Sequence, residues 1–194
     1  MKKICLNLSD SDIIYFPKFY NPEVASKMFD TLFNETDWQQ DDIKVFGKIY
    51  AQPRLTALYA ENEKSYSYSN ITMFPKPFTP LLTQIKRDIE VISNKTFSTV
   101  LLNLYRDGND SNGWHSDDEK ELGENPVIAS LSLGEARWFH LKHKQDKQQK
   151  TKIELTHGSL LLMQGSTQHF WKHQVAKTAR KVGSRINLTF RLIK

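Results

Sequence analysis

The feature that most constrains the fold of this chain is a strict alternation of polar and apolar residues at Arg185-Ile186-Asn187-Leu188-Thr189-Phe190-Arg191. Successive side chains of a β-strand point to opposite faces, so the alternation predicts a strand with one polar and one apolar face. Two arginines lie on the polar face. They suit a ligand that carries two carboxylates, because a guanidinium can bind a carboxylate through two parallel hydrogen bonds.

A second polar cluster, His115-Ser116-Asp117, and the distant His173 contain the ingredients of a metal site. Two histidines and one carboxylate are the ligands of the facial triad, which holds Fe(II) on one side and leaves the opposite positions open for substrate and dioxygen. His-x-Asp alone is a weak signal, since it also occurs by chance in surface loops. Its combination with His173 and the two-arginine strand predicts iron, a small dicarboxylate and therefore an oxygenase.

Two helix starts precede the strand-rich part of the chain. Asn21-Pro22 and Thr79-Pro80 each place an N-capping residue before a proline, which suits the first helical position. From Phe97 onward the pattern changes to short β-rich segments between polar or glycine-containing turns. Two N-terminal helices packed on a mostly antiparallel double sheet give an α+β fold, and a jelly roll is the natural candidate because its interior can hold a ligand. The predicted strands are 98–106, 127–133, 137–143, 152–156, 158–164 and 184–193.

The composition favours one globular intracellular domain. The chain of 194 residues is 39% hydrophobic and has a single cysteine, Cys5, so an internal disulfide is impossible and a reducing compartment is expected. No apolar run reaches the length of a membrane span, and polar residues interrupt any signal-like segment after Lys3. We expect a monomer without membrane association, cytoplasmic in a bacterium or nuclear in a eukaryote.

The positive charge is unevenly distributed. A net charge of +5 only raises the expectation of an anionic partner. Lysines and arginines gather, however, in the segments 142–152 and 172–185. Either run alone is equally consistent with a solvated loop. Two runs that flank the candidate histidine site favour a surface that follows phosphates.

Several segments, in order and correctly spaced, resemble the AlkB family of Fe(II)/2-oxoglutarate dioxygenases. They are Asn103–Gly108, Gly113–Glu119, Ile128–Gly134, His157–Leu161, Trp171–His173 and Arg185–Arg191. The resemblance implies a double-stranded β-helix, which is a jelly roll, in a single domain over residues 1–194. Residues 1–96 would hold the N-terminal helices and a nucleotide-recognition lid, and residues 97–193 would hold the catalytic core.

The resemblance also implies roles for the polar residues. His115, Asp117 and His173 would be the catalytic iron ligands. 2-Oxoglutarate would bind Arg185 and Tyr105 through its far carboxylate and approach Arg191 with its keto-acid end. The pocket would be completed by Asn103, Asn187 and Thr189. With O2, this chemistry hydroxylates an N-linked methyl group, which then leaves as formaldehyde.

The candidate substrate residues come from the same resemblance. The segment Val45-Phe46-Gly47-Lys48 resembles the finger with which the duplex-DNA repair branch of the family probes base pairs, although an ordinary hairpin with Val45 and Phe46 facing the core is the alternative. Tyr66-Ser67-Tyr68 resembles the lining of that branch's base pocket, and strand packing also fits its alternation. Asp118 and Glu119 would lie beside the flipped base, where a carboxylate favours a cationic lesion such as 1-methyladenine or 3-methylcytosine.

The expected function is therefore oxidative demethylation of alkylated bases, in DNA in preference to RNA. An RNA demethylase of the same chemistry is the first alternative, because a positive groove and stacking aromatic rings serve either polymer. A metal-free nucleic-acid-binding module is the second, and the complete triad and both arginines argue against it. A protein or lipid hydroxylase is the third, and it would need neither the basic segments nor the Val45-Phe46 finger.

Overall fold

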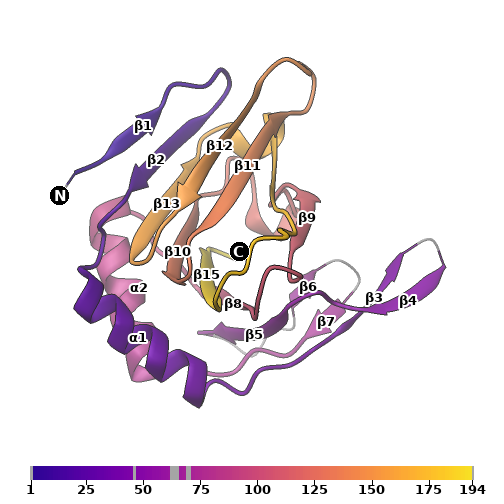
Figure 1. The fold of residues 1–194 in the computed structure, drawn as a ribbon. Helices are drawn as coiled ribbons and strands as arrows, with labels where there is room; N and C mark the ends of the chain where they lie inside the picture. Colours follow the sequence, from indigo (N-terminus) through magenta and orange to yellow (C-terminus); the bar gives the residue numbers. More distant parts are fainter. Residues whose placement is uncertain (1, 46, 62–65, 69–70, 194) are drawn as a thin grey trace.

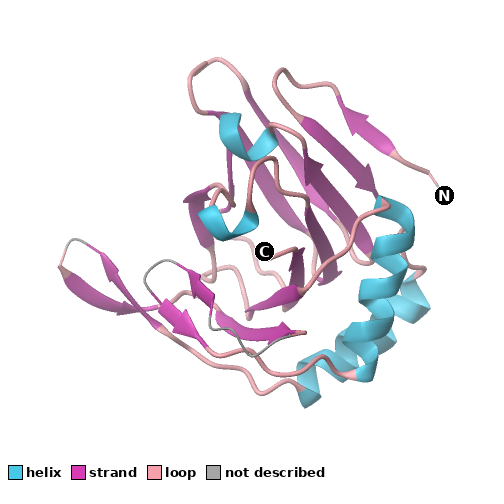
Figure 2. Ribbon diagram, turned by 180° about the vertical axis from the view of Figure 1, so that it is seen from behind, coloured by secondary structure: helices cyan, strands magenta, loops and turns pink. Residues whose placement is uncertain are grey.

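Two antiparallel sheets face each other, and two helices cover the outer side of the larger sheet (Figures 1 and 2). The computed structural model describes residues 2–45, 47–61, 66–68 and 71–193, and of residues 43–45, 66–68 and 71–72 it describes only the backbone. The major sheet has the order β1 (Ile4–Leu6), β2 (Asp12–Phe16), β13 (Ser159–Gln164), β10 (Ile128–Gly134), β15 (Arg185–Arg191), β8 (Thr99–Tyr105), β5 (Leu55–Ala60). The minor sheet has the order β12 (Lys150–Leu155), β11 (Arg137–His143), β14 (Trp171–Val175), β9 (Asn112–His115). This arrangement confirms the predicted α+β jelly roll.

Both predicted helix starts are confirmed by their caps. Helix α1 (Pro22–Glu35) begins after Asn21, whose side chain accepts a hydrogen bond from the Val24 amide. Helix α2 (Pro80–Ser93) begins after Thr79, which accepts from the Leu82 amide in the same way. Each cap satisfies one of the amides that a helix N-terminus leaves without an intrahelical partner.

All six predicted strands are present, with boundaries that differ by up to two residues. The sequence reasoning did not place the two strands that carry ligand candidates, β9 and β14, nor β1, β2 and β5 of the major sheet. Strands β2 and β5 belong to the first half of the chain but pair with β13 and β8 of the second half. The N-terminal half therefore supplies sheet as well as helices.

The alternation of β15 separates two environments. Ile186, Leu188 and Phe190 pack with α1 and α2 in the core between the helices and the major sheet. The four polar side chains of the strand point the other way, into a pocket between the two sheets. A second core fills the remaining space between the sheets and includes Tyr15, Phe139 and Trp171. One face of β15 thus contacts the hydrophobic core, and the other lines the polar pocket.

Two hairpins lie beyond the sheets. The ribbon of β3 (Asp42–Val45) and β4 (Lys48–Ala51) projects away from the body of the molecule, with β6 (Tyr66–Tyr68) and β7 (Ile71–Met73) between it and β5 (Figure 1). On β4, the side chains of Ile49 and Tyr50 are exposed. Two short helical turns, Lys120–Leu122 and α3 (Thr167–Phe170), flank the pocket residues in sequence. Among the described residues, no helix is both long and apolar enough to cross a membrane.

We expect Gly134→Ala to destabilise the fold by about 3 kcal/mol. Gly134 ends β10 with φ +86°, and an added Cβ would lie 2.4 Å from the Ser184 carbonyl oxygen and 2.7 Å from the Phe29 ring. The left-handed conformation and the overpacking each contribute roughly 1–2 kcal/mol. Gly165→Ala is the matched control, because Gly165 also has positive φ but its Cβ would meet only Asp12 at 3.5 Å. The control is expected to lose about 1 kcal/mol by urea unfolding, and equal losses for both variants would contradict the steric argument.

Candidate metal centre and dicarboxylate pocket

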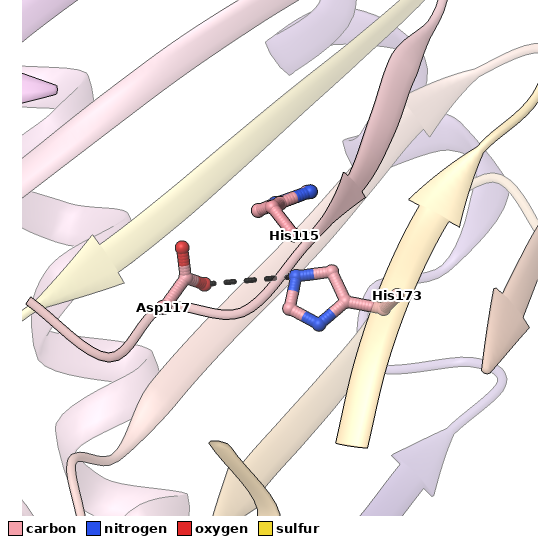
Figure 3. A group of neighbouring side chains, drawn as sticks. All are labelled: His115, Asp117 and His173. Atoms are coloured by element: carbon pink, nitrogen blue, oxygen red, sulfur yellow. Dashed lines mark ion pairs between the residues drawn. The ribbon is translucent and has the colours of Figure 1, made fainter. Parts of the chain in front are cut away.

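His115, Asp117 and His173 lie together at one end of the pocket between the sheets (Figure 3). One potential ligand atom from each residue lies within 4.8 Å of the others. His115 ends β9, His173 lies directly opposite it on β14, and Asp117 follows two residues after β9. The pairing of the edge strand β9 with β14 therefore brings together residues that are far apart in sequence.

The protonation states of the three side chains suit a metal. Burial, and after it the neighbouring His115, lower the pKa of His173 to about 3. Burial also lowers the pKa of His115. Burial opposes ionisation of Asp117, but Arg191 and the two imidazoles outweigh it and bring the pKa of the carboxyl to about 2. At neutral pH the cluster thus offers neutral imidazoles and a carboxylate, which are the forms that coordinate metal ions.

Neighbouring groups orient the three candidate ligands. His115 Nδ1 lies 2.7 Å from the Gly113 carbonyl oxygen, which can only accept, so Nδ1 donates and Nε2 keeps its lone pair. The Asp117 amide donates to Gln168 Oε1 at 3.0 Å, and Asp117 Oδ1 accepts from Arg191 Nη2 at 2.8 Å. His173 stacks on Phe139 with ring centroids 5.1 Å apart. Such supporting contacts fix ring tautomers and carboxylate orientation.

Arg185 is the strongest indication of an anionic ligand in the pocket. Its guanidinium is buried, and Nη2 donates to Ser132 Oγ at 2.9 Å. Its Nε and Nη1 atoms have no hydrogen-bond partner among the described residues, and no described carboxylate pairs with it. Burial lowers its pKa to about 10. A buried cation without a counter-ion is costly, so this site is built to receive negative charge.

The other predicted pocket residues line the same cavity. Tyr105 lies under Arg185, with 5.2 Å from Cζ to the ring centroid. Thr189 donates to Asn187 Oδ1, and Asn187 donates to Ser130 Oγ and the Leu131 carbonyl. The structure therefore brings together all nine predicted iron and 2-oxoglutarate residues. They are Asn103, Tyr105, His115, Asp117, His173, Arg185, Asn187, Thr189 and Arg191.

Two buried residues of the site, Arg54 and Gln168, were not among the predicted site residues. Arg54 donates from Nε to Asn103 Oδ1 at 2.8 Å and from Nη1 to the Ser111 carbonyl, so it ties β5 to the pocket. Gln168, on α3, holds the Asp117 amide and is fully buried. Arg54 comes beside the pocket because Thr56 pairs with Asn103 across β5 and β8. No local sequence pattern predicts the pairing of β5 with β8.

The predicted substrate residues are placed only in part. Phe46 lies outside the described residues, and the backbones of Val45, Tyr66, Ser67 and Tyr68 are described without their side chains. Gly47 has φ +80° and Lys48, at the start of β4, is exposed. Asp118 Oδ2 forms an ion pair with Lys144 Nζ at a distance of 3.0 Å. Burial raises the pKa of Glu119, and Asp117 raises it further.

Comparisons with known proteins identify the family of this chain. Residues 12–191 match the 2OG-Fe(II) oxygenase superfamily. The chain is 41% identical to bovine (Bos taurus) alpha-ketoglutarate-dependent dioxygenase alkB homolog 3 over 94% of this chain and 66% of that protein. It is 36% identical to mouse (Mus musculus) DNA oxidative demethylase ALKBH2 over 87% of this chain and 75% of that protein. The solved structure of OsALKBH1 superposes with a TM-score of 0.66 at 16% identity, covers 97% of this chain and all of that one, and supports the fold.

The chain therefore belongs to the AlkB family within the 2OG-Fe(II) oxygenase superfamily. Fe(II), 2-oxoglutarate and O2 are typical of this family, and the residues present fit them. The His-Asp-His donor set fits Fe(II), and the unpartnered buried nitrogen atoms of Arg185 fit a carboxylate of 2-oxoglutarate. The chain spans about 66% of the length of the alkB homolog 3 relatives that it matches.

Proposed function

We propose that this protein is an Fe(II)/2-oxoglutarate-dependent demethylase of alkylated bases in DNA. The observation that carries the proposal is the placement of the His115–Asp117–His173 cluster and of Arg185 in one pocket, where two guanidinium nitrogen atoms of Arg185 have no hydrogen-bond partner among the described residues. Neither feature alone is sufficient, since buried histidines and buried arginines both occur for structural reasons. Their combination supplies a metal-ligand set and an anion receptor in the same cavity.

When bound, Fe(II) and 2-oxoglutarate supply, with O2, the oxidation of an N-linked methyl group, which leaves as formaldehyde while the cosubstrate becomes succinate and CO2. His115, Asp117 and His173 hold the metal. Arg185 and Tyr105 receive the far carboxylate of the cosubstrate, and Arg191 orients Asp117. Leu101, Phe139, Met163 and Val175 also line the pocket and limit the access of water.

The name of one relative supports DNA as the substrate. The mouse relative is named a DNA oxidative demethylase, and the bovine relative an alpha-ketoglutarate-dependent dioxygenase. The target base would have to leave the stack to reach a pocket between two sheets. Val45 and Lys48 pair at the end of the projecting β3–β4 ribbon. Phe46 and Gly47 stand between them in the sequence, and the four residues are proposed to form a finger that enters the vacated stack. Tyr66, Ser67, Tyr68, Asp118 and Glu119 are proposed to receive the flipped base.

We further propose a domain organisation and an oligomeric state for the chain. Residues 1–194 would act as a single catalytic domain, with the nucleotide-recognition lid in the first 96 residues and the core in 97–193. We propose a monomer that meets its DNA in the cytoplasm of a bacterium or the nucleus of a eukaryote.

The decisive experiment compares three oligonucleotides of one sequence that contain 1-methyladenine. Duplex DNA, single-stranded DNA and single-stranded RNA are mixed anaerobically with protein, Fe(II) and 2-oxoglutarate, and the loss of methyl mass is followed after air is admitted. Loss on DNA faster than on RNA supports the proposal. Faster loss on RNA would move the substrate to the alternative polymer. Consumption of 2-oxoglutarate without any loss of methyl mass would rule out this substrate class.

Phe46→Ala tests the proposed finger. If Phe46 replaces the flipped base in the stack, the variant is expected to lose about tenfold or more in kcat/KM on duplex DNA, the cost of roughly one lost stacking contact of 1–3 kcal/mol. Its rate on single-stranded DNA should stay within about twofold, because no base pair needs to be opened. Ile49→Ala, on the same ribbon, is the control for general damage to the hairpin. Equal losses of kcat/KM on duplex and single-stranded DNA would indicate that Phe46 packs in the protein and does not enter the base stack.

A further inference from the structure

The outer face of the minor sheet carries four lysines and two tryptophans, together with His140, Glu154 and Gln174. Phe139, Leu141 and His173 point inward and are buried, so their neighbours along β11 and β14 point outward. Trp114 and Trp138 are 37% and 38% exposed. The lysine–tryptophan face consists of Trp114, Trp138, Lys142, Lys150, Lys152 and Lys172.

Like charges lie directly opposite each other on this face. Lys142 pairs in register with Lys150 on β12 and with Lys172 on β14. Cross-strand neighbours have Cβ atoms about 5 Å apart, and like charges at that distance are destabilising. None of the four lysines of the face forms an ion pair with a described carboxylate. Four lysines against the single carboxylate of Glu154 give the described part of this face an excess of positive charge.

Two of these lysines cover the tryptophan rings. Lys142 Nζ lies 4.2 Å from the centroid of Trp114, and Lys152 Nζ lies 4.4 Å from that of Trp138. Such cation–π pairs are weak at exposed sites. An anionic phosphate can therefore draw each ammonium away and leave the ring free to stack on a base.

The face is continuous with the candidate active site through Lys144. A hollow at its loop end is lined by Lys142, His143, Lys144, Lys147, Lys150 and Lys172. Lys144 Nζ donates to Asp118 Oδ2 at 3.0 Å and to the Gln168 carbonyl at 2.8 Å. Asp118 directly follows Asp117, and Gln168 holds the Asp117 amide. A nucleic-acid strand that leaves the pocket past Asp118 would thus reach this lysine-lined hollow next.

We propose that the lysine–tryptophan face binds the single-stranded nucleic acid that flanks the target nucleotide. Lysines that follow phosphates, interleaved with aromatic rings that stack on bases, are the features of single-strand binding surfaces. The exposed rings select an unpaired strand, because the bases of a duplex offer no free face to them. The inference rests on the proposed nucleic-acid substrate and extends it from the reacting base to its neighbours.

The test is the salt dependence of binding to a fluorescein-labelled, unmodified dodecathymidylate, measured by anisotropy without Fe(II) or 2-oxoglutarate. The triple variant Lys142→Gln/Lys150→Gln/Lys172→Gln removes three lysines of the face. The control Lys3→Gln/Lys18→Gln/Lys95→Gln removes the same charge from exposed positions elsewhere. The slope of log affinity against log salt is expected to fall by about 2 in the face variant, at about 0.7 per lost phosphate contact. Its affinity should fall about tenfold or more, and that of the control less than threefold.

Trp138→Ala isolates the stacking contribution, since it removes a ring without changing charge. It is expected to weaken dodecathymidylate binding several-fold at an unchanged salt slope. Equal weakening by the two triple variants would overturn the inference, as would a duplex that binds as tightly as the single strand and loses as much. Unchanged binding by the face variant, with demethylation of a methylated trinucleotide intact, would also overturn it while leaving the proposed function standing.

Discussion

Asp117→Ala is expected to reduce succinate formation at least about 100-fold, because it removes the anionic ligand of the proposed iron site. Loss of a residue that merely supports a ligand typically costs 10–100-fold in metal affinity or activity, and loss of the ligand itself should exceed that range. Asp117 also neutralises the buried Arg191 at 2.8 Å. Removing one partner of a buried ion pair typically costs 3–5 kcal/mol, so the alanine variant should also unfold more easily.

Asp117→Asn separates these two effects. An amide oxygen can still accept the hydrogen bond from Arg191, so this variant should stay folded at the temperature of the assay. It should nevertheless bind Fe(II) weakly and form almost no succinate, because the amide carries no charge. Fe(II) affinity, succinate yield and thermal unfolding are measured on both variants. A folded Asp117→Asn protein with Fe(II)-dependent turnover near that of the parent would disprove the metal assignment.

Arg185→Met is expected to raise the KM for 2-oxoglutarate about 30-fold or more, while the thermal stability of the ligand-free protein stays the same or rises. The first effect follows from the loss of a charge-assisted contact of about 2 kcal/mol. The second follows because two buried guanidinium nitrogen atoms have no hydrogen-bond partner within the described part of the chain. Initial rates over a range of 2-oxoglutarate concentrations and thermal unfolding give the two readouts.

Arg180→Met is the control for Arg185→Met, since Arg180 is an exposed arginine of the preceding loop. It should change neither quantity appreciably. A stable Arg185→Met protein with an unchanged 2-oxoglutarate requirement would show that Arg185 does not receive the cosubstrate.

The sequence predicted the strands whose patterns are unambiguous. Strand β15 alternates strictly, and β10 and β13 are runs of buried residues, as expected for strands that are covered on both sides. Strands β9 and β14 escaped prediction because functional and polar residues interrupt their apolar pattern. His115 and His173, the candidate metal ligands, are among the residues that obscure the strand pattern of β9 and β14.

The iron and 2-oxoglutarate candidates could be named from the sequence because a family resemblance fixed their order and spacing. Their convergence in one pocket agrees with those assignments. Arg54 and Gln168 could not be named, since each acquires its role from a contact about fifty residues away along the chain. The outward orientation of Lys142 and Lys172 likewise depends on the register between strands. Two lysine-rich segments were recognisable in advance, but their meeting on one face was not.

The position of β15 has a consequence for how the protein is made. This strand lies between β10 and β8 near the middle of the major sheet, although it is the last strand in sequence. Until residue 191 has left the ribosome, β8 and β10 therefore expose open edges, which are sites of misassociation. The strand that closes the sheet also carries Arg185 and Arg191. A chain interrupted before residue 185 would thus lack both the closed sheet and the proposed cosubstrate receptor, and we expect it not to turn over 2-oxoglutarate.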